Sequence, residues 1–189
     1  APSPRVRNEW LIRLLAQTGS RAREAGKIKF EHIDFDERTI KIYSDKTEKP
    51  RTVAYQPNLS TLMDIWVNGG NREVFSSAED SHYLFVTRKK GRISNDVVNS
   101  VVKKAAENAG IQEVLYVDQR GSKRYRVTAH ALRHTFGVHA INPDHGGGSM
   151  NLRYLQDVMG HENIETTEVY LKYVGEEAVR DMQRHGPSF

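Results

Sequence analysis

The residues best suited to do chemistry gather in HALRHTFGVHA, residues 130–140, which contains His130, Arg133, His134 and His139. If this stretch is helical, positions three and four apart share a face, so His130 stands beside both Arg133 and His134. A pair of histidines suits a metal ion, whereas a histidine beside an arginine suits an anion such as phosphate. The two interpretations predict different reactions.

The metal interpretation is the weaker one. His130 and His134 have the spacing of the HExxH zinc motif, but Ala131 occupies the position of its general-base glutamate. A zinc site would also need a third ligand, for which His145 and His161 are available. The chain has no cysteine, so disulfides and thiolate ligands are excluded. We therefore expect no metal and no cofactor.

Other short motifs surround this stretch in a fixed order. Thr18-Gly-Ser-Arg-Ala-Arg-Glu24 precedes it, and Met159-Gly-His161 and Thr166-Thr-Glu-Val-Tyr170 follow it. Together with His130-Ala-Leu-Arg133, these motifs resemble the boxes of the tyrosine recombinase, or phage-type integrase, catalytic domain. The resemblance runs from about residue 8 to the end of the chain. It implies a mainly helical α+β fold with small antiparallel β-sheets.

The resemblance also implies a role for each matching residue. Arg21 (rather than Arg23, by register) and Arg133 would grip the phosphate, since a guanidinium is always charged and binds phosphate bidentately. His130 would accept the proton of the nucleophile, and His161 would hydrogen-bond a phosphate oxygen.

The nucleophile and the general acid come from two further motifs. Tyr170 would attack phosphorus and form a 3′-phosphotyrosyl intermediate, with Tyr173 as the alternative tyrosine. Lys46 in SDKTEKPRTV would protonate the leaving 5′-oxygen as general acid, with Lys49 as the second choice.

Three remaining residues have no chemical task. Glu24 is expected to brace the arginine or the adjacent turn. His134 and His139 are expected to pack.

Two dense basic clusters suggest contacts with the DNA backbone. TRKKGR, residues 87–92, and QRGSKRYR, residues 119–126, each contain one glycine that could mark a turn. The second cluster lies in a hairpin longer than the family pattern, and we expect it to add a backbone contact. The residues predicted to bind DNA are Arg88, Lys89, Lys90, Arg92, Arg120, Lys123, Arg124 and Arg126.

Apolar periodicity and turn signals predict the elements that hold these residues. Short strands are expected over 30–42 and 52–55, a strand or extended segment over 82–87, and a hairpin over 114–128. A loop is expected over 141–149. Ser94 and Thr128 should cap the helices that follow them, and Asn58 or Ser60 should cap the helix over 59–68. Helices are predicted over 8–17, from about Ser20, and over 59–68, 93–110, 129–141, 152–160, 163–173 and 176–186.

Composition limits the class of protein. The 189 residues are 38% hydrophobic and 28% charged, with a net charge of +4, which is ordinary for a globular domain and too apolar for general disorder. No apolar run approaches the roughly 20 residues of a membrane span. We expect a cytoplasmic protein that acts on nucleoid or host-cell DNA and has no membrane partner.

The domain organisation follows from the resemblance. We expect residues 1–189 to form a single catalytic domain without the family's N-terminal core-binding domain. Such a chain is either a fragment or a naturally minimal protein, and we favour the fragment. The tail, residues 174–189, resembles a helix that docks on a neighbouring protomer, although it could also fold back on its own chain.

The function predicted from these residues is that of a site-specific DNA recombinase or integrase. It would cleave and rejoin double-stranded DNA without metal or ATP, as a homo-oligomer (a tetramer) on paired sites. The alternatives are type IB topoisomerase-like relaxation and a catalytically inactive DNA-binding module.

Overall fold

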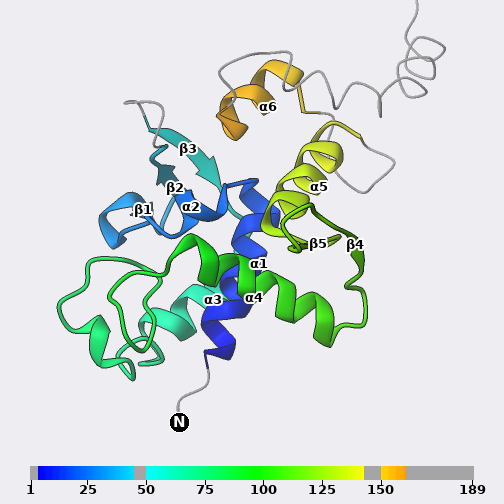
Figure 1. Ribbon diagram of the computed structural model, residues 1–189. Helices are drawn as coiled ribbons and strands as arrows, with labels where there is room; N and C mark the ends of the chain where they lie inside the picture. Colours follow the sequence, from blue (N-terminus) through cyan, green and yellow to red (C-terminus); the bar gives the residue numbers. More distant parts are fainter. Residues whose placement is uncertain (1–3, 45–49, 143–149, 161–189) are drawn as a thin grey trace, which may run out of the picture.

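The computed structural model describes residues 4–44, 50–142 and 150–160. Within these ranges the chain is a mainly helical α+β domain with two small antiparallel sheets, as predicted (Figure 1). The helices are α1 (Arg5–Thr18), α2 (Ala22–Ala25), α3 (Pro57–Val67), α4 (Asn95–Asn108), α5 (Ala129–Ile141) and α6 (Leu152–Met159), with 3-10 turns η1 (Phe30–His32) and η2 (Ser76–Ala78). The strands are β1 (Ile33–Asp34), β2 (Thr39–Ile42), β3 (Arg51–Ala54), β4 (Val114–Val117) and β5 (Lys123–Tyr125).

Helix α1 runs through the middle of the domain and contributes much of its core (Figure 1). Trp10, Leu11, Leu14 and Leu15 are fully buried, at the helical spacing seen in the sequence. The Trp10 ring packs 4.7 Å from the ring of Phe85. Because α1 touches α3, α4 and α5, it fixes the helices that carry the candidate site.

The three-stranded sheet has the order β1-β2-β3 and is antiparallel. Ile40, Ile42 and Val53 are buried, so one face of the sheet covers the core. Arg51 pairs with Ile42 and lies two positions before Val53, which puts it on the same face as Val53. The start of β3 therefore directs an arginine towards the interior.

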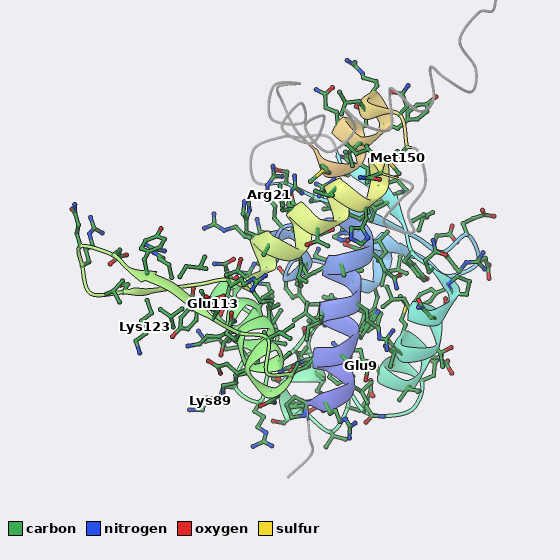
Figure 2. All side chains as sticks on the ribbon, turned by 90° about the vertical axis from the view of Figure 1, so that its right-hand side faces the viewer. Glu9, Arg21, Lys89, Glu113, Lys123 and Met150 are labelled. Atoms are coloured by element: carbon green, nitrogen blue, oxygen red, sulfur yellow. The ribbon has the colours of Figure 1, made fainter. Side chains whose placement is uncertain are left out.

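Strands β4 and β5 form a hairpin that projects from the domain (Figure 2). Its turn is ordered by Asp118, whose carboxylate accepts hydrogen bonds from the backbone N–H groups of Arg120 and Ser122. Gly121 adopts the left-handed conformation at φ +76°, which a glycine reaches without strain. Every residue of β4 is exposed.

Helix caps account for where the helices begin. Ser94 and Thr128 cap α4 and α5, as predicted, by accepting the backbone N–H of Val97 at 3.4 Å and of Ala131 at 3.1 Å. The predicted cap of α3 is wrong: this helix begins at Pro57. Proline is favoured at the first helical position because its φ is already helical and its missing N–H would have no helical partner there.

Other predictions need smaller corrections or lie outside the described residues. The segment 82–87 is not a regular strand; within the described residues it makes one isolated bridge, between Tyr83 and Lys29. The second helix begins at Ala22 rather than near Ser20. The helices predicted over 163–173 and 176–186, the tail 174–189, and residues 143–149 of the predicted loop lie outside the described residues. None of the described helices has both the length and the apolar character needed to cross a membrane.

Candidate active site

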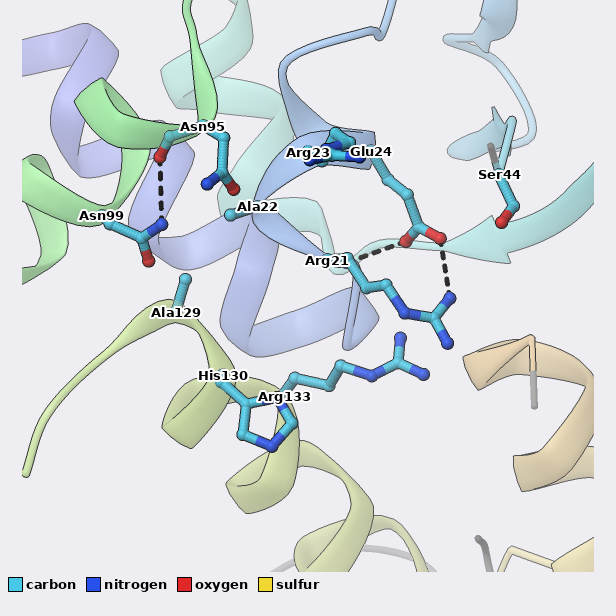
Figure 3. Close-up of a pocket in the computed structure, with 10 residues that line it drawn as sticks. All are labelled: Arg21, Ala22, Arg23, Glu24, Ser44, Asn95, Asn99, Ala129, His130 and Arg133. Atoms are coloured by element: carbon cyan, nitrogen blue, oxygen red, sulfur yellow. Dashed lines mark hydrogen bonds and ion pairs between the residues drawn. The ribbon is translucent and has the colours of Figure 1, made fainter. Parts of the chain in front are cut away.

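A pocket of about 360 Å³ lies where α2, α4 and α5 meet (Figure 3). The turn before α2, the first turns of α4 and α5, and the residues after β2 all contribute to its wall. The lining residues are Arg21, Ala22, Arg23, Glu24, Ser44, Asn95, Asn99, Ala129, His130 and Arg133.

Arg21 occupies the position before α2 and is held by the carboxylate of Glu24. The backbone N–H of Arg21 donates to Glu24 Oε2 at 2.8 Å, and Arg21 Nη1 donates to Glu24 Oε1 at 2.9 Å. The Arg21 side chain is nevertheless 41% exposed. It is therefore oriented by the protein while part of its surface remains accessible to an anion.

Arg133 is buried and bridges two distant parts of the chain. Its Nη1 donates to the carbonyl oxygen of Gly19 and its Nη2 to that of Met159, each at 2.6 Å. Figure 3 shows the guanidinium groups of Arg21 and Arg133 beside one another at the pocket. Two positive charges held this close favour a bound anion.

His130 lies in the first turn of α5, one turn before Arg133, and also lines the pocket. It is exposed, in contrast to the buried Arg133. The predicted pairing of His130 with Arg133 on one helical face is confirmed. His134 is half-buried and the expectation that His139 packs is wrong, because His139 is exposed; neither lines the pocket.

The turn at Gly19 sets the position of both arginines. Gly19 ends α1 in the left-handed conformation at φ +60°. A Cβ atom there would overlap the ring of Phe136 on α5. Glycine is thus required both by its backbone conformation and by the close approach of α5.

Glu24 is buried and shared between two arginines. Besides Arg21, it accepts hydrogen bonds from Arg51 Nη1 at 3.1 Å and Arg51 Nη2 at 2.7 Å. Burial raises the pKa of the Glu24 carboxyl, but the hydrogen bonds and charge of Arg51, together with hydrogen bonds from Arg21, outweigh it and hold the pKa below its ordinary value. The expectation that Glu24 braces the arginine is confirmed.

The C-terminal end of α6 reaches the same place. Gly160 follows α6 in the left-handed conformation at φ +64°, and Arg21 Nη2 lies 3.4 Å from its carbonyl oxygen. The last carbonyls of a helix lack helical partners and carry partial negative charge. The arginines supply the missing donors.

Comparison with known proteins identifies the family. A model of the phage integrase family matches residues 2–176. The chain belongs to this family.

The matched relatives are tyrosine recombinases. Tyrosine recombinase XerC of Bifidobacterium longum strain DJO10A is 28% identical over 189 residues, covering 97% of this chain and 47% of that protein. Tyrosine recombinase XerA of Pyrococcus furiosus is 25% identical over 186 residues, covering 97% of this chain and 56% of that protein. The integrase-family chain thus spans about half the length of the curated relatives it matches.

Solved structures confirm the predicted fold. The crystal structure of XerA recombinase aligns with a TM-score of 0.68 at 25% identity, over 96% of this chain and 64% of that one. XerH site-specific recombinase, solved bound to its difH substrate, aligns with a TM-score of 0.70 over 93% of this chain and 45% of that one. At 24% identity this second likeness supports the fold alone.

Three of the six residues predicted to be catalytic meet in this integrase-family pocket, namely Arg21, His130 and Arg133. The other three, Lys46, His161 and Tyr170, lie outside the described residues. Ser44, two positions before Lys46, lines the pocket, and Gly160, directly before His161, accepts from Arg21. The roles of Lys46, His161 and Tyr170 therefore stay predictions.

Several residues at this site were not predicted from the sequence. Asn95 and Asn99 on α4 line the pocket, and Arg51 binds Glu24. Asn95 and Asn99 share a helical face because they are four positions apart, but only the packing of α4 on α2 and α5 shows what that face meets. Arg51 directly precedes the strand predicted over 52–55 and is the first residue of β3, and its partners lie far away in the sequence.

The predicted DNA-binding residues of this integrase-family domain lie in two places. Arg88, Lys89, Lys90 and Arg92 line a second hollow of about 430 Å³. Within the hairpin, Arg124 pairs with Asp118 at 2.8 Å and Arg126 with Glu113 at 3.3 Å. Arg120 and Lys123 stand at and beside the turn, and Figure 2 shows Lys89 and Lys123 extending on the same side of the molecule.

Metal ligands do not gather within the described part of the chain. Across residues 4–44, 50–142 and 150–160, no three histidine, aspartate or glutamate side chains come together as metal ligands. His145 and His161, the candidate third ligands, fall outside these ranges. Metal independence therefore stays a prediction.

Proposed function

We propose that this domain is the catalytic part of a site-specific DNA recombinase or integrase, which breaks and rejoins DNA strands through a tyrosine. The observation that carries the proposal is the meeting of Arg21, Arg133 and His130 in one pocket. Membership of the phage integrase family supports it.

The two guanidinium groups address the main obstacle to cleaving a phosphodiester. A nucleophile must approach an anionic centre, and negative charge on the non-bridging oxygens must be stabilised in the transition state. Arg21 and Arg133 are held by Glu24 and by backbone carbonyls before any substrate arrives. Because they are already oriented, little free energy is lost in reorganising them during the reaction.

The remaining steps are assigned from the family resemblance. The Tyr170 oxygen attacks phosphorus while the bond from phosphorus to the 5′-oxygen breaks. The phenolic proton passes to His130, Lys46 donates a proton to the departing 5′-oxygen, and His161 hydrogen-bonds a non-bridging oxygen. In the reverse direction a 5′-hydroxyl attacks the phosphotyrosine. The phosphodiester energy is retained in the phosphotyrosine, so the cycle needs no ATP, and none of the assigned steps uses a metal.

The proposed partner is double-stranded DNA, bound by several copies of the protein, as a tetramer on paired sites. The XerH neighbour was solved on its difH substrate, which makes DNA the natural first ligand to test. The basic residues of the 87–92 loop and of the β4–β5 hairpin are proposed to contact the DNA backbone, with Arg120 and Lys123 foremost because Arg124 and Arg126 already pair with carboxylates.

Covalent capture on a pool of duplexes tests the proposal for any target sequence. The chain is incubated with a random-sequence library of duplexes, each nicked near its centre so that cleavage releases a short fragment and traps the protein on DNA. A denaturation-resistant adduct is expected, and sequencing the trapped DNA identifies the preferred duplex. The adduct should form equally well with a metal chelator present.

Matched tyrosine variants decide the nucleophile. Tyr170→Phe should abolish the adduct and Tyr173→Phe should leave it. If Tyr173→Phe alone removes the adduct, the assignment of the nucleophile is wrong. If the native chain forms none on any duplex, the catalytic proposal fails. Supercoil relaxation without recombinant products would instead indicate topoisomerase-like activity.

A further inference from the structure

Three arginines from separate parts of the chain donate hydrogen bonds to the carbonyl oxygens at the end of α6. Arg51 Nε donates to the carbonyl oxygen of Val158 at 2.7 Å, Arg133 to that of Met159, and Arg21 to that of Gly160. Three consecutive carbonyls thus each receive a guanidinium donor. Such an arrangement fixes the end of the helix through its backbone, at its negative pole.

Arg51 differs from the other two because it does not line the pocket. Its side chain is 12% exposed, and its three nitrogens donate to Val158 and to both oxygens of Glu24. A residue engaged in this way does not reach a substrate phosphate. Any effect it has on the reaction must pass through its neighbours.

Those neighbours are parts of the site. Glu24 Oε1 accepts from both Arg21 Nη1 and Arg51 Nη1, so one carboxylate oxygen links the two guanidinium groups. Arg51 also packs against Gly160, where a Cβ atom would stand 3.1 Å from Arg51 Nη1. Arg51 therefore touches both the group that orients Arg21 and the residue that ends α6.

We propose that Arg51 is a positioning residue, which joins Arg21, Glu24 and the end of α6 into one rigid unit. This inference rests on the proposed function, since it makes Arg51 set the position of the phosphate-binding Arg21 relative to the end of α6. A misplacement of about 1 Å can slow a reaction on the order of a hundredfold.

The test compares Arg51→Gln with Arg72→Gln. Arg72 is also buried and donates to the carbonyls of Ala78, Ser81 and Tyr83, and it does not line the pocket. Arg72→Gln thus controls for the general cost of losing a buried guanidinium. Arg51→Lys keeps a positive charge beside Glu24 but lacks the planar guanidinium with its several donors. It should therefore restore only part of the reaction rate that Arg51→Gln loses.

The first measurement is single-turnover adduct formation on the nicked duplex trapped by the native chain, below the unfolding temperature of every variant. Arg51→Gln should lower the rate at saturating DNA tenfold to a hundredfold and change the dissociation constant less than about twofold, an estimate that follows from a positioning defect. Arg72→Gln should keep the native rate per folded molecule. A rate for Arg51→Gln within twofold of the native rate overturns the proposal.

The second measurement does not depend on catalysis. Backbone hydrogen exchange over residues 152–160 should speed up in Arg51→Gln and not in Arg72→Gln, and unchanged exchange there overturns the proposal.

If the native chain forms no adduct, the proposed function has failed, and the inference is tested by the binding of inorganic phosphate. Phosphate should raise the Tm of the native chain and of Arg72→Gln by more than that of Arg51→Gln, because Arg21 is less well oriented without Arg51 and phosphate lacks the further contacts that DNA has; an equal rise in all three proteins overturns the inference.

Discussion

Glu24 is a buried carboxylate whose charge is balanced by Arg21 and Arg51. Without these arginines, burial would favour the protonated acid. The carboxylate also joins the stability of the fold to the orientation of Arg21. A single acidic residue outside the chemical step therefore has a measurable effect on both.

Glu24→Gln should destabilise the protein at neutral pH by about 3 kcal/mol, because two arginines lose a buried counter-charge. The pKa of Glu24 is lower in the folded state than in the unfolded chain, so its stabilisation is full above the ordinary glutamate pKa and is lost as the pH falls through the folded value. The difference in the free energy of unfolding between Glu24→Gln and the native chain should hence become smaller below about pH 4. Urea unfolding between pH 7 and pH 3 measures it.

The control for this variant is Glu31→Gln. Glu31 pairs with Lys29 at 3.1 Å, but its side chain is 68% exposed, and solvent screens such a pair. The free energy of unfolding of Glu31→Gln should remain close to that of the native chain at each pH. A Glu24→Gln penalty that stays constant down to pH 3 would contradict the assignment of the charge.

The contact between the end of α1 and helix α5 positions both pocket arginines. Gly19 ends α1 against Phe136, and the Gly19 carbonyl accepts from Arg133 on the same helix as Phe136. A shift of this contact would move Arg21, two residues later, and Arg133 at once. The glycine thus determines how closely the two arginines approach.

Gly19→Ala should destabilise the protein by more than Gly110→Ala does. Both glycines have positive φ, at +60° and +69°, so each alanine variant bears a strain of about 1 kcal/mol. Only at Gly19 does the added methyl also meet another side chain, since no atom lies within 4 Å of a Cβ at Gly110. Urea unfolding of the two variants measures the difference.

A double-mutant cycle isolates the steric part of this effect. Phe136→Ala removes the ring that the methyl would strike, so the penalty of Gly19→Ala should be smaller in that background than in the native chain. An equal penalty in both backgrounds would show that the close approach of α5 is not what selects glycine.

Across the molecule, exposed basic residues gather on the 87–92 loop and on the β4–β5 hairpin. The chain carries a net charge of +4, and its 87–92 loop and β4–β5 hairpin extend on one side (Figure 2). A two-stranded ribbon is narrow enough to follow a groove of DNA. This side of the molecule is the surface proposed to face the duplex.

The combined change Arg120→Gln and Lys123→Gln should weaken binding to duplex DNA and flatten its salt dependence. Each phosphate contact that is lost reduces the slope of log K against log salt by about 0.9. Arg13→Gln removes one positive charge from α1, where Arg13 pairs with Glu9, and should leave the slope unchanged. Titrations at several salt concentrations measure both, and equal slopes for all proteins would exclude the hairpin from the interface.

The local features of this molecule could be predicted from its sequence, whereas the contacts between distant residues could not. His130 and Arg133 are one helical turn apart, so their common face followed from spacing alone. Arg51 and Val158 are 107 positions apart, and no periodicity connects them. The exposure of β4 could not be predicted either, because an apolar VLYV strand usually indicates burial. Only the surrounding packing shows that none of the described residues covers this strand.

The anchoring of α6 through its carbonyls has a consequence for how this domain tolerates sequence change. A carbonyl oxygen is present whatever side chain its residue bears, so the three arginines hold α6 without constraining most of its amino acids. Selection should therefore act on Arg21, Arg51 and Arg133 and on Gly160, with Leu155 and Met159 kept apolar by burial. The exposed positions of α6 should tolerate substitution, because the residues that hold the helix in place lie elsewhere in the chain.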